Sequence, residues 1–149
     1  MRAPKKILND PYEVAADMLD GLIEAYDGEV VKAGTASLVK TNIPEGKVAL
    51  LVGGGSGHEP IYHGLVGTNL ADGAACGEIF AAPPPYVILE CAQAVHRDNG
   101  VLFVYGNYAG DVLNFDLAVE LCKAEGMNVQ SVLVRDDISS DRKSTRLNS

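Results

Sequence analysis

The chain has 149 residues, 47% of them hydrophobic and 21% charged, a balance that is typical of one globular domain and excludes a disordered chain. Its formal net charge of −8 argues against a nucleic-acid binder, because most of this surface would repel a phosphate backbone. No apolar run reaches the length of a membrane span, and the basic N-terminus is not followed by the apolar segment of a signal peptide, so no membrane contact and a cytoplasmic location are expected.

The N-terminal third is predicted to form a helix and an edge hairpin. Apolar residues repeat at helical spacing from about Pro11 to Tyr26, and Asp10 is placed to cap the start of this helix. Residues 27–46 mix short apolar pairs with turn residues. This segment favours two short strands at the edge of a sheet.

The stretch KVALLVGGGSGHEP, residues 47–60, is the centre of the predicted fold. The predicted strand is Lys47 to Val52, and its apolar run, Val48 to Val52, is continuous, as in a strand that is covered on both faces of a parallel sheet. The glycines at 53–55 are expected to turn the chain sharply after this strand. Ser56, His58 and Glu59 would then emerge at the carboxyl end of the strand, where α/β folds bind small molecules.

Strands and helices alternate through the rest of the chain. This predicts an α/β fold whose sheet is parallel, mixed at its edge and covered by helices on both faces, as in sugar phosphotransferase domains. If the third strand lies beside the first, the loops at 53–60 and 106–111 are neighbours. The predicted elements are strands at 73–79, 101–105 and 129–134, a proline-stiffened connection at 83–85, and helices at about 87–95 and 111–126.

One domain is expected over residues 1–138. The segment 139–149 has one apolar residue in eleven and is expected to be an unstructured or artefactual tail. Cys76, Cys91 and Cys122 are odd in number and lie in apolar surroundings. This pattern is typical of buried reduced thiols and not of disulfides or a metal site.

The glycine loop, residues 53–57, fits none of the common phosphate or nucleophile motifs. A P-loop needs a lysine and a hydroxyl residue after its last glycine, whereas His58 and Glu59 follow here. A dinucleotide fingerprint counted from Gly53 and a nucleophile elbow centred on Ser56 both need glycine at position 58. Two interpretations of His58 remain: a cap of a following helix, or a ligand site that uses amides at a helix N-terminus. In a ligand site, His58 could bind a substrate oxygen, transfer a proton or carry a phosphoryl group.

Asp111 likewise has two interpretations. An aspartate before a helical run is typical of an N-cap, but its place at a strand end opposite the histidine also suits a general base. His63 is expected at the surface or an interface, and His96 near a solvated helix end. Glu78 could line the same sheet edge without a catalytic role. Asp136–Asp137 is interpreted as a pair of turn residues and not as a metal site.

Four segments resemble, in the same order, the substrate-binding subunit or domain of dihydroxyacetone kinases. They are KVALLVGGGSGHEP, CGEIFAAPPP, GNYAGDVLNF and VRDD, and the likeness extends from about Ile7 to Ile138. The pair GGGSGHEP and NYxGDxxNF is specific. The resemblance implies the N-terminal part of a ketose kinase, which binds dihydroxyacetone or a related short ketose such as erythrulose and phosphorylates its hydroxyl.

The same resemblance implies roles for individual residues and partners. Gly55, Ser56, Gly57 and His58 would hold the ketose, and Asp111 would be the base, which makes His58 and Asp111 the catalytic pair. The domain itself would bind no cofactor, because ATP or ADP with Mg lies on a separate helical nucleotide-binding domain or subunit in this family. A homodimer is expected. Family members also anchor the ketone covalently through a histidine in a later domain, so this chain alone is not expected to be active.

The sequence departs from the family pattern at two places. Gly106 stands where many dihydroxyacetone kinases have a lysine, which removes a hydrogen-bond donor and opens space for a larger ketose. Ala81, Ala82 and Pro84 replace a hydroxyl-bearing pattern. Two alternative functions therefore remain: a non-catalytic co-regulator that senses a ketose, and a phosphocarrier domain that uses His58.

Overall fold

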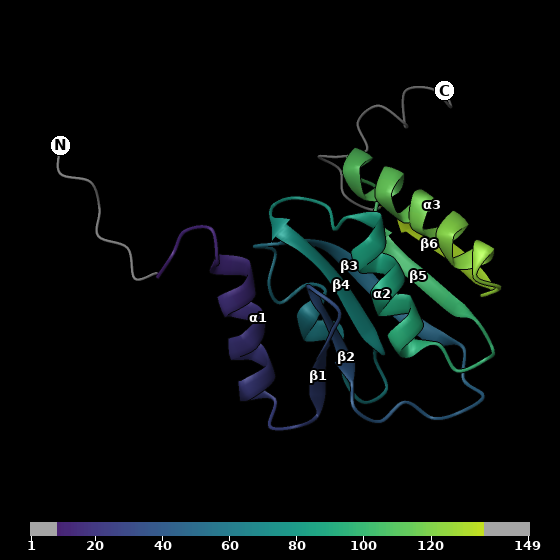
Figure 1. The fold of residues 1–149 in the computed structure, drawn as a ribbon, viewed down its shortest axis with the longest axis horizontal. Coiled ribbons are helices and arrows are strands. Elements are labelled where there is room, and N and C mark those ends of the chain that lie inside the picture. Colours follow the sequence, from purple (N-terminus) through teal and green to yellow (C-terminus); the bar gives the residue numbers. More distant parts are fainter. Residues whose placement is uncertain (1–8, 136–149) are drawn as a thin grey trace.

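The computed structural model of the chain describes residues 9–135. These residues form a six-stranded mixed sheet in the order β1-β2-β4-β3-β5-β6 (Figure 1). The predicted tail at 139–149 and the pair Asp136–Asp137 lie outside the described residues. The strands are β1 (Val30–Ala33), β2 (Ser37–Lys40), β3 (Ala49–Ser56), β4 (Gly73–Ile79), β5 (Val101–Gly106) and β6 (Val129–Val134).

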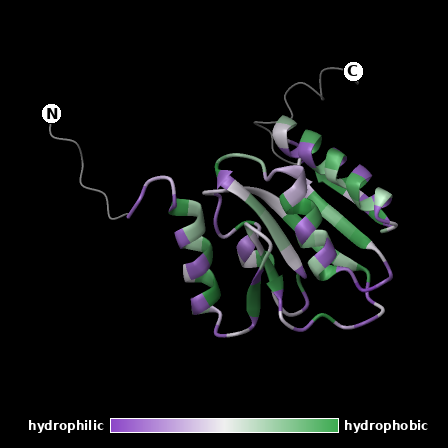
Figure 2. Ribbon diagram, in the orientation of Figure 1, coloured by the Kyte–Doolittle hydropathy of each residue, from purple (hydrophilic) through white to green (hydrophobic). Residues whose placement is uncertain are grey.

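The helices cover both faces of the sheet, as predicted, and α2 and α3 lie side by side on one of them (Figure 1). Side chains alternate across a strand, so neighbouring residues of β3 enter different cores. Leu51 packs in the cluster under α2 and α3, whereas Val52 packs in the cluster that contains Leu19 of α1. Hydrophobic and hydrophilic residues alternate along each of these helices (Figure 2), and α3 also exposes Leu113, Leu117 and Leu121. The helical elements are α1 (Val14–Ala25), the 3-10 turn η1 (His63–Leu65), α2 (Pro85–Val95) and α3 (Ala109–Ala124).

The order of the strands places the predicted loops together. Strand β3 is parallel to both of its neighbours, β4 and β5. After β3 the chain forms β4 on one side of this strand and then β5 on its other side. The change of direction creates a topological switch point at the carboxyl ends of these strands. The prediction that the third strong strand lies beside the first is confirmed, with Leu51 opposite Phe103.

The N-terminal region confirms the edge hairpin and corrects the helix start. Strands β1 and β2 pair antiparallel, and β2 also pairs antiparallel with β4. Helix α1 begins at Val14 and not at Pro11. The predicted cap was wrong: Glu13 occupies the N-cap position without a side-chain cap, and the Asp10 carboxylate instead accepts a hydrogen bond from the Tyr12 N–H at 2.9 Å.

The glycines of the central stretch do not turn the chain, contrary to the prediction. They belong to β3, which continues to Ser56. Their role is close approach, because a Cβ on Gly54 would overlap the Tyr62 ring and one on Gly55 would lie 2.8 Å from the Ala81 nitrogen. The chain turns only after Ser56, at Gly57, whose φ of +96° suits glycine.

The three cysteines are buried free thiols, as predicted. Burial raises the pKa of the Cys91 thiol to about 12 and that of Cys122 to about 11, so both stay protonated at neutral pH. These thiols therefore act as small apolar side chains in the core. Within residues 9–135, no helix is long and apolar enough to cross a membrane.

Candidate ketose site

The candidate site lies at the carboxyl ends of the three central parallel strands. The turn after β3 carries His58, the segment after β4 carries Phe80, and the first turn of α3 carries Asp111. Sequence reasoning placed His58 and Asp111 together, and the two side chains are close enough for the charge of His58 to affect the pKa of Asp111.

His58 is exposed in a turn and caps no helix. The only helical structure that follows in this loop is the short 3-10 turn η1, so the predicted amides at a helix N-terminus are not formed. Two aromatic rings instead fix the imidazole edge-on, Phe80 with its centroid at 5.1 Å and Tyr62 at 6.5 Å. The histidine is thus supported from the side while one part of its ring remains open to a ligand.

Glu59 stabilises the turn that carries His58. Its carboxylate accepts the Gly57 N–H, at 2.9 Å to Oε2 and 3.2 Å to Oε1. Glu59 Oε1 also lies 3.3 Å from His63 Nδ1, in a geometry that falls short of a hydrogen bond. His63 was expected at the surface, but it is 1% exposed, and this burial lowers the pKa of its imidazole although Glu59 opposes the change. His63 is therefore a packing residue behind the loop.

Asp111 is the buried carboxyl group of the site. It is the third residue of α3 and 6% exposed, and the N-cap position belongs to Tyr108, so the interpretation of Asp111 as an N-cap was wrong. Burial raises the pKa of Asp111 to about 6, and the nearby charge of His58 partly offsets this rise. Among the described residues, its Oδ1 has no hydrogen-bond partner. One oxygen of this carboxyl group is therefore buried without a protein donor among the described residues, which leaves an acceptor unsatisfied beside His58.

Ser56 and the neighbouring glycines pack beneath the His58 loop and connect it to β4. The Ser56 hydroxyl is buried and donates to the Gly77 carbonyl at 2.7 Å, which joins the ends of β3 and β4. A Cβ on Gly57 would lie 2.9 Å from the Phe80 ring. These contacts give Ser56 and Gly57 a clear structural role, and their predicted contact with substrate stays a prediction.

Sequence reasoning gave no role to the aromatic residues Tyr62 and Phe80, and it recognised Tyr108 only as part of the NYxGDxxNF motif. Tyr62 and Phe80 have φ of 68° and 56°, a conformation that is strained for bulky residues and is enriched at functional sites. The pKa of the Tyr62 hydroxyl rises to about 12, first because of burial and then because of the Asp111 and Tyr108 charges. No spacing pattern could have found these residues, because they meet only in the folded chain.

Gly106 opens directly into this aromatic group. A Cβ at this position would lie 3.1 Å from the Tyr108 ring and 3.8 Å from the Tyr62 hydroxyl. A longer side chain at position 106 would therefore enter the site. Asn114, one turn beyond Asp111, donates to the Pro83 carbonyl at 2.9 Å and ties α3 to the proline connection.

The remaining candidates are His96 and Glu78, of which only Glu78 lies at the same sheet edge, near the carboxyl end of β4. His96 is the C-cap of α2, as expected for a residue near a helix end. Glu78 is exposed and, with Ser56 and His63, lines a separate small cavity of about 80 Å³ under α1. In the part of the chain that the structure describes, no group of His, Cys, Asp and Glu side chains could hold a metal ion.

Comparison with known proteins identifies the family. The model of the Dak1 domain matches residues 20–148. The chain belongs to the Dak1 family. This Dak1 chain is 41% identical over 136 residues to the dihydroxyacetone-binding subunit DhaK of a PTS-dependent dihydroxyacetone kinase from Lactococcus lactis, covering 91% of the chain and 41% of that protein. It is 46% identical to the D-erythrulose kinase of Mycolicibacterium smegmatis, covering 91% of the chain and 23% of that protein.

Solved structures agree with the Dak1 assignment. The dihydroxyacetone kinase from C. freundii, in complex with AMP-PNP and Mg2+, superposes with a TM-score of 0.87 at 34% identity and covers 95% of the chain. A dihydroxyacetone kinase operon co-activator, DhaQ, superposes with a TM-score of 0.79 at 31% identity and covers 84% of the chain. The Dak1 chain spans less than half of each of these proteins, 27% of the kinase and 38% of the co-activator. The predicted family and α/β fold are confirmed.

Proposed function

We propose that this Dak1 chain is the ketose-holding part of a ketose kinase and that it binds dihydroxyacetone or a related short ketose such as erythrulose for phosphorylation. The observation that supports this most is the buried Asp111 carboxylate, whose Oδ1 has no hydrogen-bond donor among the described residues and whose pKa responds to the charge of His58 at the same sheet edge. Relatives named as dihydroxyacetone and erythrulose kinases share this region of the sequence.

Asp111 supplies the base in this proposal. A carboxyl group with a pKa of about 6 is mostly ionised at pH 7, yet it is more basic than an ordinary aspartate. It accepts the proton of a ketose hydroxyl while the hydroxyl oxygen bonds to the phosphorus of the donor. The bond from phosphorus to the leaving oxygen of the donor breaks in line with this attack.

His58 and the glycine loop orient the ketose. The imidazole has a free edge for a hydrogen bond to a substrate oxygen, and its contacts with Phe80 and Tyr62 limit the rotation of the ring. Holding the attacking hydroxyl in one geometry is a large part of the rate in phosphoryl transfer. The aromatic rings also exclude water from one side of the site.

The phosphoryl donor comes from elsewhere in this proposal. ATP or ADP with Mg would sit on a separate helical domain or subunit, as the family resemblance implies. The magnesium would neutralise charge on the donor phosphates. We also propose that the protein is a cytoplasmic homodimer. The kinase structure with AMP-PNP and Mg2+ supports a nucleotide site outside this region, since the chain matches only 27% of that protein.

A second candidate is a co-regulator that senses a ketose without transferring phosphate. The fold likeness to the co-activator DhaQ favours it. It would need the ketose pocket but no base, so the effect of Asp111 on turnover separates the two functions.

Ketose binding tests the proposal on the 149-residue chain itself. In a titration followed by amide chemical shifts in ¹H–¹⁵N NMR, dihydroxyacetone or erythrulose should shift residues 55–58 and Asp111 in a saturable way. His58→Ala should remove this response because it deletes the hydrogen-bonding ring. His96→Ala, at the C-cap of α2, is the matched control and should keep it. Absence of saturable shifts with both ketoses would contradict the proposal, as would equal binding by His58→Ala.

Gly106 is expected to set the preference for larger ketoses. In Gly106→Lys, the new side chain would pass the Tyr108 ring and bring an ammonium into the site. Occupied space should penalise erythrulose more than dihydroxyacetone, so the ratio of kcat/KM for erythrulose over dihydroxyacetone should fall about tenfold, the scale of one steric or polar contact. The assay needs this region in its full-length protein with the nucleotide-binding partner. An unchanged ratio would show that the residue at position 106 does not discriminate between the two ketoses.

A further inference from the structure

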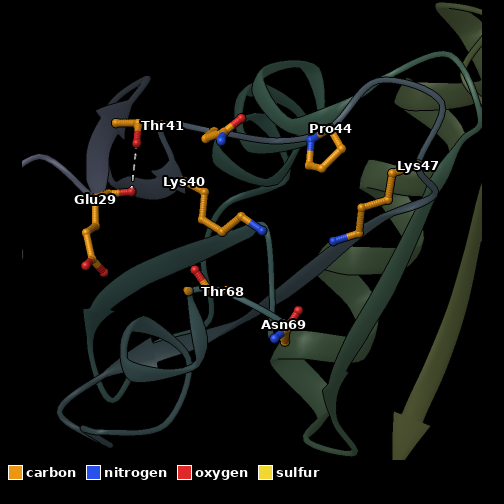
Figure 3. Close-up of a pocket in the computed structure, with 9 residues that line it drawn as sticks. Glu29, Lys40, Thr41, Pro44, Lys47, Thr68 and Asn69 are labelled. Carbon is orange, nitrogen blue, oxygen red and sulfur yellow. Dashed lines mark hydrogen bonds between the residues drawn. The ribbon is translucent and has the colours of Figure 1, made fainter.

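A second polar cavity lies at the opposite end of the sheet from His58. It has a volume of about 490 Å³ and sits at the amino-terminal ends of β3 and β4, beside the end of β2 (Figure 3). Nothing in the proposed kinase chemistry uses it. Its lining includes two lysines and four neutral polar residues, Lys40, Lys47, Thr41, Asn42, Thr68 and Asn69.

Both lysines hold one buried carboxylate. Asp72 is fully buried, and its Oδ1 lies 2.8 Å from Lys40 Nζ and 2.7 Å from Lys47 Nζ. Its Oδ2 accepts the Leu50 N–H at 2.8 Å. Burial alone would raise the pKa of Asp72, but the hydrogen bonds from the two lysines and from Leu50 prevail and lower it. Asp72 is therefore ionised and has donors on both oxygens.

One positive charge is left over in this arrangement. A single lysine would neutralise Asp72, yet two ammonium groups share one of its oxygens. Each ammonium has three N–H donors, of which one points to Asp72. The Lys40 side chain is only 11% exposed, so bulk water solvates it poorly. The Lys47 side chain is 35% exposed, so the surplus charge is only partly shielded from water, and an anion would supply acceptors for the spare donors.

The side chains point these spare donors into the cavity. Figure 3 shows the Lys40 and Lys47 ammonium groups facing each other across its centre, with Thr68 and Asn69 beneath them. The carboxylate of Glu29, which also lines the cavity, points away from both lysines. The centre of the cavity is therefore positive and rich in donors, while its acidic residue lies at the margin.

We propose that Lys40 and Lys47 bind the phosphate or carboxylate group of a small metabolite in this cavity. One oxyanion reaches both ammonium groups, since these share an oxygen of Asp72. The volume fits a small molecule and exceeds that of a bare ion. The hydroxyl of Thr68 and the amide of Asn42 are neutral groups that can hydrogen-bond the polar remainder of such a ligand.

The test titrates the 149-residue chain with inorganic phosphate and, separately, with succinate, at ionic strength held constant with chloride, by ¹H–¹⁵N NMR. We expect saturable shifts at residues 40–42, 47 and 67–69 with at least one of the two anions. The anion that saturates identifies the group, and saturation by both supports an oxyanion site in general. Residues 55–58 should not respond, which separates this result from the outcome of the ketose titration.

Lys47→Gln removes one ammonium and leaves Lys40 to neutralise Asp72. Its dissociation constant should rise about tenfold, as for the loss of one charge-assisted hydrogen bond. Thr68→Val keeps both ion pairs and the shape of the lining, and it should weaken binding a few-fold even if Lys47→Gln fails to fold. Lys32→Gln, which breaks the exposed pair with Asp20, is the matched control and should bind as the parent chain does. Absence of saturation by either anion, or unchanged binding in both Lys47→Gln and Thr68→Val, would overturn the proposal.

Discussion

Replacing Asp111 by asparagine should strongly slow phosphorylation and make the protein more stable. We expect Asp111→Asn to lower kcat about 10²- to 10⁴-fold, the usual contribution of a general base. The same substitution should raise the free energy of unfolding at pH 7 by up to about 3 kcal/mol. Loss of activity and gain of stability from one atom change is the signature of a functional group that is held in an unfavourable place.

The rate falls because an amide cannot accept the proton of the ketose hydroxyl. Asparagine keeps the shape of Asp111 and one acceptor oxygen, so the ketose should still bind. KM should therefore change much less than kcat. The measurement is steady-state turnover of dihydroxyacetone and erythrulose by the full-length protein with its nucleotide-binding partner. In the parent protein, kcat should decline as pH falls below about 6, because protonation removes the base.

Stability rises because folding buries a carboxylate without a partner on Oδ1. The pKa of Asp111 goes up from 3.8 to about 6, so between these pH values the folded state binds more protons than the unfolded state. The contribution of Asp111 to the free energy of unfolding is therefore most unfavourable above pH 6 and recovers as pH falls toward 3.8. The stability difference between Asp111→Asn and the parent chain should shrink over this range in urea titrations of the 149-residue chain.

Asp116→Asn is the matched control, because Asp116 lies on the same helix but is exposed. It should leave turnover within about twofold and stability within about 0.5 kcal/mol. Unchanged turnover in Asp111→Asn, with ketose binding intact, would favour the co-regulator over the kinase. A less stable Asp111→Asn would contradict the unfavourable burial of the carboxylate.

Much of the fold could be predicted because its strands are strongly patterned. The strands Gly73–Ile79 and Val129–Val134 were predicted with the observed bounds, since each lies between turn residues and a predicted helix. The neighbouring positions of β3 and β5 followed from the alternation of strands and helices. The local pattern of apolar residues was thus sufficient to predict the architecture and the sheet edge at which the candidate residues meet.

What failed depended on contacts between distant residues. Glycines in sequence suggest a turn, but the close approach of Tyr62 and of the chain near Ala81 keeps Gly54 and Gly55 in β3. His63 was expected at the surface or an interface, whereas the fold behind the loop buries the imidazole. The roles of Tyr62 and Phe80 were missed for the same reason. Tertiary packing overrides local propensity at such positions.

Gly53→Ala should lower the free energy of unfolding by about 3 kcal/mol, which is at the upper end of the range for overpacking a core. A Cβ at Gly53 would overlap the Ala75 carbonyl oxygen and lie 2.8 Å from the Phe115 ring. Neither neighbour can move easily. Ala75 is fixed in the parallel pairing of β3 with β4, and Phe115 is stacked on Tyr105 with ring centroids 4.1 Å apart.

Gly21→Ala supplies the matched control for this glycine. Gly21 lies in α1, and a Cβ there would meet nothing within 4 Å. Alanine favours helix and restricts the unfolded chain, so this variant should gain about 0.5–1 kcal/mol. Urea denaturation of both variants measures the contrast: the same added methyl group should have opposite signs at the two positions. A Gly53→Ala protein as stable as the parent would mean that β3 and β4 can separate to admit the methyl group, and the tight central pairing that places Ser56 and His58 at the sheet edge would then not be required.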